Sequence, residues 1–571
     1  MKPRHFPCSA VFVIAATACL VAPLVAQTTY VWDGGPAGTG SNISLAANWT
    51  SDTLPISTSS TSDTAVWDGT VSASLTLTNS NTPAAIGGIA GASGANLSIT
   101  AGQSGSLTIT GTSIRTNDIT VASGAGAVSL PNIQIGGRTI DTSHTINNNS
   151  SSGLILASLS KGGNNNRAVT FTGSGDTTVT GQINPGATGA INITKNGAGT
   201  LFLNGDSSIS TAWGGTLAVN SGAVRVAHSQ ALGTTGGVTT VSGGSSTARL
   251  ELIGGISVGE TLGLNGKDSL ATGAHLVNSG GDNSLSGAIT LNTGGNSYNF
   301  RSDSGKLTVS SALGIGGGST ASKSLNVSGS GNTELSGIVS NGTGTLSVSK
   351  SGGGTLTFSN ANIYSGNTTV SGGTLLVNNT SGSGTGAGVV NVDSGGTLGG
   401  TGAISGAVNV TGVLAPGASV QTLSSGALTF NGGSTFAVDL DSSVSPTVGA
   451  DLQKVSGDLN LSGTVALTLA DIALTNVALP LGATFSLINY TGSWNNGYFT
   501  FGGNEIANNG QFTAGLNTWE ISYNATEGGS NFTGEFAGGS DSFVNIAVVP
   551  EPASILLGGV GVLLLFRRRV R

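Results

Sequence analysis

Three histidines, His144, His228 and His275, carry the imidazole groups of the chain beyond its first residues. They stand far apart and no partner motif surrounds them, so we expect each to be a surface or turn residue. The segment Gly255–Gly259 reads GISVG and fits the spacing of a nucleophile elbow. A chain this rich in Gly and Ser matches that spacing by chance, and no strand-turn-helix context surrounds it. The sequence therefore predicts no catalytic residues.

One acidic cluster stands out, made of Asp439, Asp441, Asp451 and Asp458. Calcium is an open alternative there, but the acids lack the set spacing of a calcium loop. No Gly-Lys-Ser/Thr phosphate loop occurs. We therefore predict no metal site and no cofactor.

Composition favours β structure and argues against nucleic acid as a partner. Glycine contributes 95 of 571 residues and charged residues only 8%. Between Gln27 and Val549 there are 13 basic and 25 acidic residues, a net charge of −12, with no basic stripe. Helix formers are scarce while Val, Thr, Ile and Leu recur, so long helices are not expected.

The long middle of the chain consists of short alternating runs separated by Gly, Asn and Ser clusters. Examples are SLTLTN (74–79), SLTIT (106–110) and ALTFNG (427–432). Alternation bounded by turn residues predicts strands with one face toward a core. We therefore expect an all-β protein.

These runs repeat. ITKNGAGTLFLNG (193–205) matches VSKSGGGTLTFSN (348–360), and WGGTLAVN (213–220) matches SGGTLLVN (371–378). The Gly-Thr-Leu tripeptide recurs at Gly199, Gly215, Gly344, Gly354, Gly373 and Gly396. A strand, a glycine corner and another strand every twenty residues or so is what one coil of a β-solenoid needs, with Leu stacked on Leu. Glycine-rich low complexity without a fold is the open alternative.

The stretch from Lys350 to Asn379 resembles the autotransporter-associated β-strand repeat of secreted passenger proteins, and Lys195–Asn220 resembles it more weakly. The resemblance implies a right-handed parallel β-helix, that is, a β-solenoid. Residues 71–441 would then form about 18 coils and a rod of about 90 Å.

Each end of the solenoid is expected to be capped. Residues 27–70 carry Trp32, Trp49 and Trp67 and predict an N-terminal cap. Residues 442–546 predict a β-rich C-terminal cap whose aromatic residues cover the last coil: Tyr490, Trp494, Tyr498, Phe499, Phe501, Phe512, Trp519 and Tyr523. A membrane β-barrel at this end is the competing idea, but the stretch is short and has no aromatic girdle pattern.

The first 26 residues predict a signal peptide. Lys2 and Arg4 precede an apolar run from Ala10 to Leu20, and small residues place a cleavage site between Ala26 and Gln27. Lipoprotein processing at Cys19 is the rival interpretation. Once the leader is removed, the chain has no cysteine left.

The end of the chain, residues 547–571, predicts a short membrane helix. Its apolar part has fourteen residues, or about 21 Å, against a membrane core of about 30 Å. These anchor residues are Ala553, Ser554, Ile555, Leu556, Leu557, Gly558, Gly559, Val560, Gly561, Val562, Leu563, Leu564, Leu565 and Phe566. Arg567, Arg568 and Arg569 follow as the stop signal on the cytoplasmic side.

Val549-Pro550-Glu551-Pro552, the apolar segment and the arginines together resemble a PEP-CTERM sorting signal. The resemblance implies that an exosortase-type membrane protease transiently recognises Pro550, Glu551 and Pro552 and that the tail is cut on export. An ordinary single-span anchor is the alternative.

The function expected from these features is a non-enzymatic, structural or adhesive protein exported by a Gram-negative-type bacterium. It would be held briefly in the inner membrane and end at the cell surface or in the extracellular matrix. The family link to exopolysaccharide implies contact with that polymer or with a cell-surface glycan. Two alternatives stay open: a β-helix polysaccharide lyase or hydrolase, and a passenger released as an effector.

Overall fold

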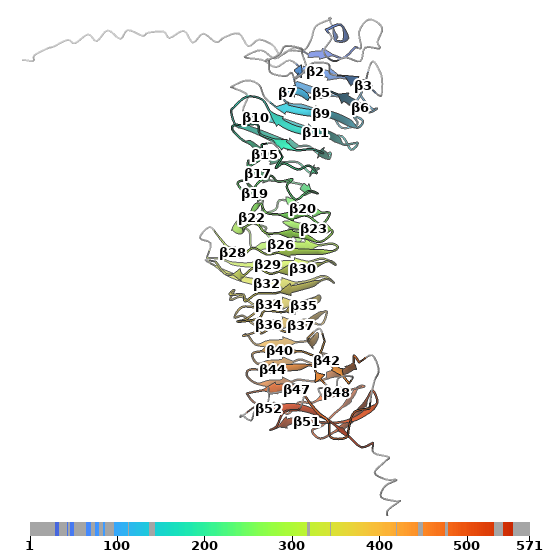
Figure 1. Ribbon diagram of the computed structural model, residues 1–571, viewed down its shortest axis with the longest axis vertical. Coiled ribbons are helices and arrows are strands. Elements are labelled where there is room, and N and C mark those ends of the chain that lie inside the picture. Colours follow the sequence, from blue (N-terminus) through green and yellow to red (C-terminus); the bar gives the residue numbers. More distant parts are fainter. Residues whose placement is uncertain are drawn as a thin grey trace, which may run out of the picture.

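The computed structural model describes residues 29–33, 43, 46–50, 64–69, 75–78, 84–85, 96–111, 113–135, 143–209, 211–316, 320–342, 344–417, 419–442, 449–473, 478–529 and 541–551. Within them the chain is all β, with the 3-10 turns η1 (Ala46–Asn48) and η3 (Leu270–Thr272) and no α-helix. Strands stack along a long rod of about 14 turns (Figure 1). The all-β solenoid predicted from the sequence is therefore confirmed.

Neither 3-10 turn in the described part of the chain is long and apolar enough to cross a membrane. The hydrophobic helix expected at Ala553–Phe566 lies outside the described residues, as do the arginines after it and the leader with its Ala26–Gln27 cleavage site.

Three long ladders and one cap sheet hold the strands. The first sheet runs β1 (Thr29–Val31), β2 (Thr64–Trp67), β5 (Asn96–Ile99), β8 (Ile119–Val121), β10 (Ser143–Asn148), β12 (Arg167–Thr172), β15 (Ile191–Lys195), β17 (Leu217–Val219), β19 (Val238–Val241), β22 (Thr261–Gly266), β25 (Ile289–Gly294), β28 (Leu313–Ile315) and β31 (Val339–Ser340).

The second sheet is the longest ladder: β3 (Leu75–Thr78), β6 (Leu107–Thr110), β9 (Val128–Ile135), β11 (Leu154–Lys161), β13 (Thr177–Val179), β16 (Thr200–Leu203), β18 (Ala223–Val226), β20 (Arg249–Ile253), β23 (Leu276–Gly280), β26 (Ser297–Ser302), β29 (Ser322–Ser328), β32 (Thr345–Lys350), β34 (Thr368–Val370), β36 (Val390–Val392), β38 (Val408–Val410), β41 (Leu428–Phe430) and β45 (Leu459–Leu461). Near its start, β4 (Ala84–Ala85) pairs with β7 (Ser113–Thr116), β7 with β9, and β14 (Ile183–Asn184) with β11.

The third sheet begins further along the chain: β21 (Ser257–Val258), β24 (Asn283–Leu285), β27 (Lys306–Val309), β30 (Asn332–Leu335), β33 (Thr355–Phe358), β35 (Gly373–Val377), β37 (Gly396–Gly400), β39 (Val413–Pro416), β42 (Thr435–Asp441), β46 (Val465–Asp471), β48 (Phe499–Phe501) and β49 (Asn504–Glu505), with β43 (Gly449–Ala450) beside β42. The cap sheet has the order β40 (Thr422–Ser425), β44 (Leu452–Val455), β47 (Thr484–Tyr490), β52 (Ser542–Val549), β51 (Asn517–Ala525) and β50 (Gln511–Ala514).

Coil length explains why the rod has fewer turns than the sequence predicts. Where all three sheets are present, one coil takes 23 to 27 residues: Leu262 pairs with Ile289 after 27, and Ser322 with Thr345 after 23. Where only the second and third sheets remain, Val348 pairs with Thr368 after 20 residues. Our prediction of about 18 coils took the shorter coil for the whole chain and is wrong. About 14 turns give a rod of about 65 Å.

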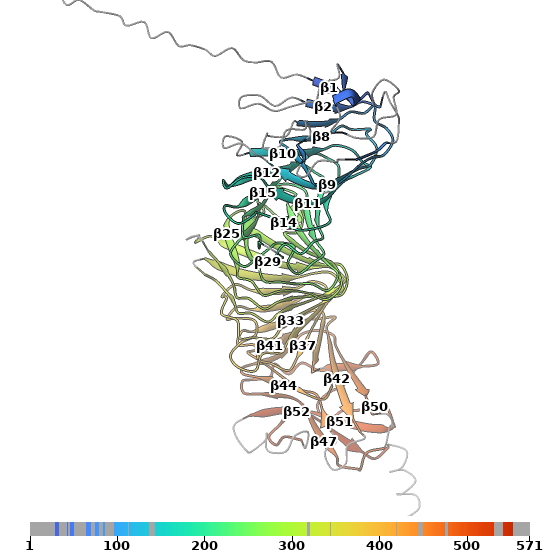
Figure 2. The same ribbon diagram turned by 45° about the horizontal axis from the view of Figure 1, so that its top comes forward.

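The stacked core follows from the alternation in the sequence. In β35 the side chain of Leu375 points inward and is fully buried, and it pairs with Leu356 on one side and Leu398 on the other. Outward positions stack like on like too: Asn391 pairs with Asn409, and the Asn409 amide donates to the Asn391 side-chain oxygen over 3.0 Å. The tilted view in Figure 2 shows the strands of successive coils following one another along the rod.

Glycine is required at the corner of each matched repeat. Gly197 and Gly352 both have a φ of 74°, which side chains rarely adopt. A Cβ on Gly197 would also lie 2.3 Å from the carbonyl oxygen of Gly173 in the adjacent coil. These corners are tight because neighbouring coils are only about 4.8 Å apart.

Aromatic residues close the two ends of the rod. Trp32, Trp49 and Trp67 are buried, and their ring centroids lie 5.2 to 6.3 Å apart. At the other end, the ring of Phe499 packs on Phe430 and Phe436 at 5.9 and 5.8 Å. The parallel ladders do not stop at Asp441, since β42 pairs in parallel with β46 and β46 with β48.

Candidate functional site

Two of the three histidines, His144 and His275, are buried, and His144, which lies inside a strand, departs from the expectation of a surface or turn residue. His275 is fully buried, and burial lowers its pKa to about 4. Its ring is therefore neutral: Nε2–H donates to the Asn265 carbonyl over 2.8 Å, while the Asn299 N–H donates to Nδ1 over 3.0 Å. His144 is buried in β10, and His228 is half-buried. His275 thus joins the loop before β23 to neighbouring strands of the solenoid.

The GISVG segment is a corner and strand of the third sheet. Ser257 opens β21, its N–H bonds to the Ser229 hydroxyl, and its own hydroxyl accepts from Ser284 in the next coil. The segment is an ordinary rung of the ladder and not a nucleophile elbow.

The four aspartates of the acidic cluster do not converge. Asp451 is buried and accepts the N–H groups of Gln421 and Asp439, both over 2.9 Å. Burial raises its pKa to about 7, and the nearby Asp439 charge adds to the effect. Asp458 instead accepts the N–H and hydroxyl of Ser493. Across the described ranges, no three His, Cys, Asp or Glu side chains gather closely enough to bind a metal ion.

Asp451 has a structural task at the junction of solenoid and cap. It lies just before β44 of the cap sheet, and its two backbone donors come from the segment before β40 and from β42. One carboxylate therefore ties the third sheet to the first strands of the cap sheet.

Buried lysines are the feature that sequence reasoning missed. Lys195 stacks between Phe171 and Val219 inside the coil, with only 3% of its surface exposed. Its ammonium group donates to the carbonyls of Asn196, Gly197 and Ser221 at 2.7, 2.9 and 3.2 Å. The Ser221 carbonyl belongs to the next coil, so the lysine clamps two successive corners together.

Lys350 makes the same clamp in the second matched repeat. It stacks between Val327 and Val370 and donates to the carbonyls of Ser351, Gly352 and Gly372 at 2.9, 2.8 and 3.0 Å. Burial lowers the pKa of both Lys195 and Lys350 to about 8. We call this arrangement the lysine clamp.

The clamp also corrects one alignment made from the sequence. The sequence pattern pairs Trp213–Asn220 with Ser371–Asn378. In the structure, however, the equivalent carbonyls that accept from the two lysines in the next coil are those of Ser221 and Gly372, so these two residues correspond to each other. The counterpart of β35 is therefore β18, one strand later than β17. The Gly-Thr-Leu match was wrong because that tripeptide opens strands of all three sheets.

Three further lysines direct their ammonium groups to backbone carbonyls. Lys267 donates to Ser246 and Ala248, Lys323 to Gly294 and Gly295, and Lys161 to Gly163, all between 2.7 and 2.9 Å. All three are buried. Most lysines beyond the leader thus hold the coils together.

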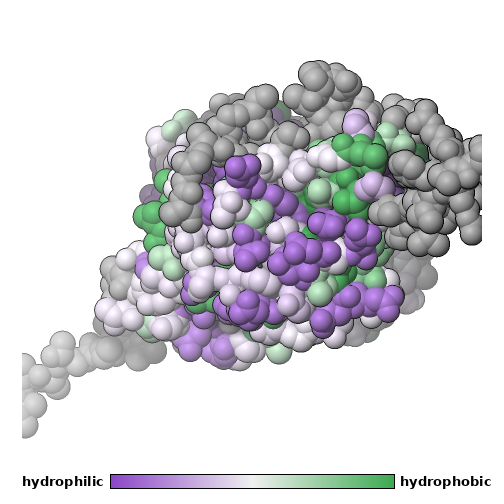
Figure 3. Space-filling view, turned by 90° about the horizontal axis from the view of Figure 1, so that it is seen from below, coloured by the Kyte–Doolittle hydropathy of each residue, from purple (hydrophilic) through white to green (hydrophobic). Residues whose placement is uncertain are grey.

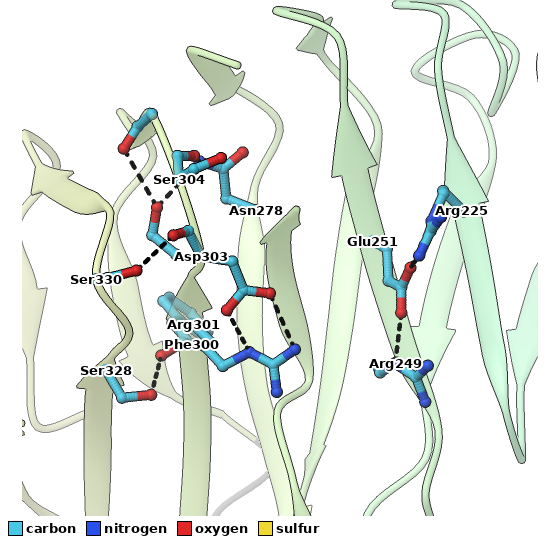
Figure 4. Close-up of polar contacts among 12 residues, drawn as sticks. Arg225, Arg249, Glu251, Asn278, Phe300, Arg301, Asp303, Ser304, Ser328 and Ser330 are labelled. Atoms are coloured by element: carbon cyan, nitrogen blue, oxygen red, sulfur yellow. Dashed lines mark hydrogen bonds and ion pairs between the residues drawn. The ribbon is translucent and has the colours of Figure 1, made fainter. Parts of the chain in front are cut away.

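Charged side chains gather on the outer face of the second sheet. Register places Phe202, Arg225, Glu251, Val277, Arg301 and Ser328 in one file, in which Glu251 and Val277 are buried and the other four are partly or fully exposed. Glu251 bonds Arg225 at 2.5 Å and Arg249 at 2.6 Å, and Arg301 bonds Asp303 at 2.8 Å (Figure 4). The Arg225 guanidinium also lies over the Phe202 ring, 5.3 Å from its centroid. We call these residues the charged file.

The C-terminal motif leaves the folded body without a linker. β52 is an inner strand of the cap sheet, with β47 on one side and β51 on the other, both antiparallel to it. Its last residue, Val549, pairs with Thr518. Pro550 and Glu551 follow at once and are exposed, while Pro552 lies outside the described residues. The predicted recognition motif therefore begins where a paired strand ends.

Comparison with known families supports both resemblances seen in the sequence. The passenger-associated-transport-repeat family matches residues 193–226 and 348–377, which are the two lysine-clamp repeats. The PEP-CTERM protein-sorting motif matches residues 548–570. No curated protein matches the chain. A sorting signal and passenger-type repeats in a β-solenoid mark an exported, cell-surface β-helix protein, and the motif implies processing by an exosortase, a membrane enzyme.

Proposed function

We propose that this protein is a non-enzymatic rod of the cell surface or extracellular matrix. An exosortase-type protease would recognise Pro550, Glu551 and Pro552 while the tail rests in the inner membrane. The observation that carries the proposal is the unbroken run of parallel ladders into a cap whose inner strand β52 leads directly into the sorting motif. Such a chain is a continuous solenoid and cap that lead directly into a sorting motif.

The non-enzymatic part of the proposal rests on what the titratable groups do. Asp451 is bonded to two backbone N–H groups, both ring nitrogens of His275 are hydrogen-bonded, and Lys195 is bonded to three carbonyls. Groups used in this way maintain the fold and are not presented to a substrate. A polysaccharide lyase or hydrolase would need acids and a base free to act on one open face, whereas Glu251 and Asp303 on the outer face of the second sheet are each ion-paired with arginine.

The charged file is the surface we propose for contact with exopolysaccharide or a cell-surface glycan. It brings two partly exposed guanidinium groups, an aromatic ring and the Ser328 hydroxyl into one file on a chain with only 8% charged residues. Arginine offers planar donors that match carboxylates and sugar hydroxyls. A line of such groups along a rod suits an extended polymer.

The sorting proposal is tested by tagging both ends of the chain and fractionating the cells. Surface protein should lack the C-terminal tag, and this loss should disappear in an exosortase-deficient strain. A C-terminal tag that persists on mature surface protein would refute the sorting proposal.

The adhesive proposal is tested with purified protein and native exopolysaccharide. The double variant Arg225→Gln, Arg301→Gln should weaken binding, because both residues lie in the charged file. Lys306→Gln is the matched control, since Lys306 is similarly exposed but lies in the third sheet, paired with Glu334. If wild-type protein binds neither the polymer nor cells, or if the control weakens binding as much, the glycan contact is lost.

A further inference from the structure

Two of the most exposed leucines of the structure flank the point where the chain leaves the cap. Leu481 is 68% and Leu516 61% exposed, values at which an apolar side chain is largely in water. Leu516 lies in the turn before β51, two residues from Thr518, which pairs with Val549. Leu481 lies beside Gly482, whose N–H bonds to the Val548 carbonyl over 2.8 Å. One leucine therefore stands on each side of the end of β52.

The sequence after β52 limits how far this point can be from a membrane. Only Pro550, Glu551 and Pro552 separate Val549 from Ala553, where the apolar run of the sorting signal begins. Four residue steps span at most about 14 Å. If the tail is in a bilayer, the end of β52 and its two leucines are at the surface of that bilayer.

The surface beside Leu516 carries a small, partly open cleft. The cleft beside Leu516 measures about 80 Å³ and is lined by residues such as Leu440, Leu469 and Trp519. Ligand pockets usually enclose about 300–1,000 Å³. Figure 3, which views this end of the molecule, shows green hydrophobic side chains gathered toward part of the rim and purple ones over the centre. A partly apolar rim beside so small a cleft suits a lipid surface better than a small ligand.

The scarcity of basic residues near the cap indicates that its contact with a bilayer is apolar rather than electrostatic. From Ser351 to Phe566, Lys454 is the only Lys or Arg in the sequence. Attraction of basic residues to anionic lipids therefore contributes little at this end of the rod. Leucines that dip into the interface act through burial of apolar area instead.

We propose that Leu481 and Leu516 form a foot on which the cap rests against the bilayer while the tail holds the protein there. The foot would fix the end of β52 at the membrane surface and so present the sorting motif to a membrane protease at a defined depth. This inference rests on the proposed membrane anchoring of residues 553–566.

The test uses protein that lacks the leader but keeps its uncut C-terminal tail, inserted through that tail into phosphatidylcholine vesicles. From Gln27 onward the chain has no cysteine, so Leu481→Cys, Leu516→Cys and Ile363→Cys give unique sites for a nitroxide label. Ile363 is the matched control, because it is also an apolar residue with 68% exposure but lies far up the rod. Collision of each label with oxygen and with an aqueous nickel chelate reports its depth.

We expect collision with the nickel chelate to be at least about threefold slower at positions 481 and 516 than at 363, with more oxygen collision. Adding phosphatidylglycerol should leave the values unchanged. Equal access of the chelate to all three labels overturns the foot. Broadening of the nitroxide spectrum by contact between labels on two molecules also overturns the foot, since a second copy of the protein would then cover the leucines.

Flotation of the unlabelled protein separates the two proposals. Protein that floats with vesicles but shows water-exposed labels overturns the foot alone. Protein that does not float overturns the membrane anchoring and the foot together.

Discussion

Removing the ammonium group of Lys195 is the most direct test of the lysine clamp. In Lys195→Met the side chain keeps its shape, but the carbonyls of Asn196, Gly197 and Ser221 lose their donor. Hydrogen bonds to a charged donor contribute roughly 1.5–3 kcal/mol each, or roughly 4–9 kcal/mol for three. Burying the charge opposes this stabilisation. It lowers the lysine pKa from 10.5 to about 8, which corresponds to a cost of roughly 3 kcal/mol for the charged form.

The balance predicts that local opening of the two clamped coils becomes easier by about 3 kcal/mol at pH 7, which is roughly a hundredfold. Native-state hydrogen exchange measures this at the amides of Asn196 and Asn220, which bond to Phe171 and Lys195 across neighbouring coils. Lys306→Met is the control, because the exposed Lys306–Glu334 pair contributes about 1 kcal/mol or less.

Unchanged or slower exchange at these two amides in Lys195→Met would refute the reasoning. It would mean that burying the charge offsets all three bonds. An equal rise at the amide of Ser351, which bonds to Val327 in the other repeat, would also refute it, because the clamp acts locally.

The remaining predictions concern pH, the core and the cap. The pKa of Lys195, Lys267 and Lys350 is lowered to about 8, so between pH 8 and 10.5 the folded chain holds neutral amines, which unlike Met still donate N–H groups to the carbonyls, while the unfolded chain binds more protons. Stability therefore rises with pH, by roughly 1.5 kcal/mol per lysine from pH 8 to 9.5. Urea midpoints that stay flat or fall over this range would contradict it; above pH 10 the gain should fade, because burial raises the pKa of Tyr364 and Tyr523. Leu375→Ala, which empties one place in a stacked file, should destabilise its coils by about 2–5 kcal/mol, while Leu376→Ala on the outward face should have a much smaller effect in the same exchange experiment. Asp451→Asn should destabilise the cap by about 1–3 kcal/mol, since an amide has one acceptor oxygen for two backbone N–H groups. Aromatic fluorescence during urea titration measures this change, and a variant as stable as wild type would contradict the proposed role of Asp451 in joining the third sheet to the cap sheet.

Local sequence patterns predicted the ladders well, because the alternation of inward and outward residues is contained within each strand. In SGGTLLVN, the inward Leu375 and Val377 alternate with outward Thr374 and Leu376, and the structure buries them in that order. The Trp32, Trp49 and Trp67 group was visible as three tryptophans close together in the sequence, and their rings do pack on one another. Period-two alternation is a short-range signal, so it survives without knowledge of the partner strands.

The buried lysines could not be predicted by the same logic. Lys195 and Lys350 occupy equivalent places in ITKNGAG and VSKSGGG, so the repeat itself held the signal. Alternation even places both residues on the inward face. A lysine is expected at the surface unless its charge finds partners, and the partners here are carbonyls of a corner one coil away.

The surroundings of His275 and Asp451 could not be predicted from the sequence for a related reason. Their surroundings come from residues 10 to 30 positions away, such as Asn265, Asn299 and Gln421. No local motif encodes these contacts, since they arise only when one coil is laid on the next.

The sequence by itself determined that the chain is a β-solenoid with passenger-type repeats and a sorting motif. Alternation, glycine corners and the sorting motif are each local patterns, contained within a short stretch of the chain. Only the tertiary structure decided the number of coils, the lysine clamps, the charged file and the position of the motif at the end of an inner strand. Those features depend on register between coils, and register is set by which corners and strands meet when the whole rod is stacked.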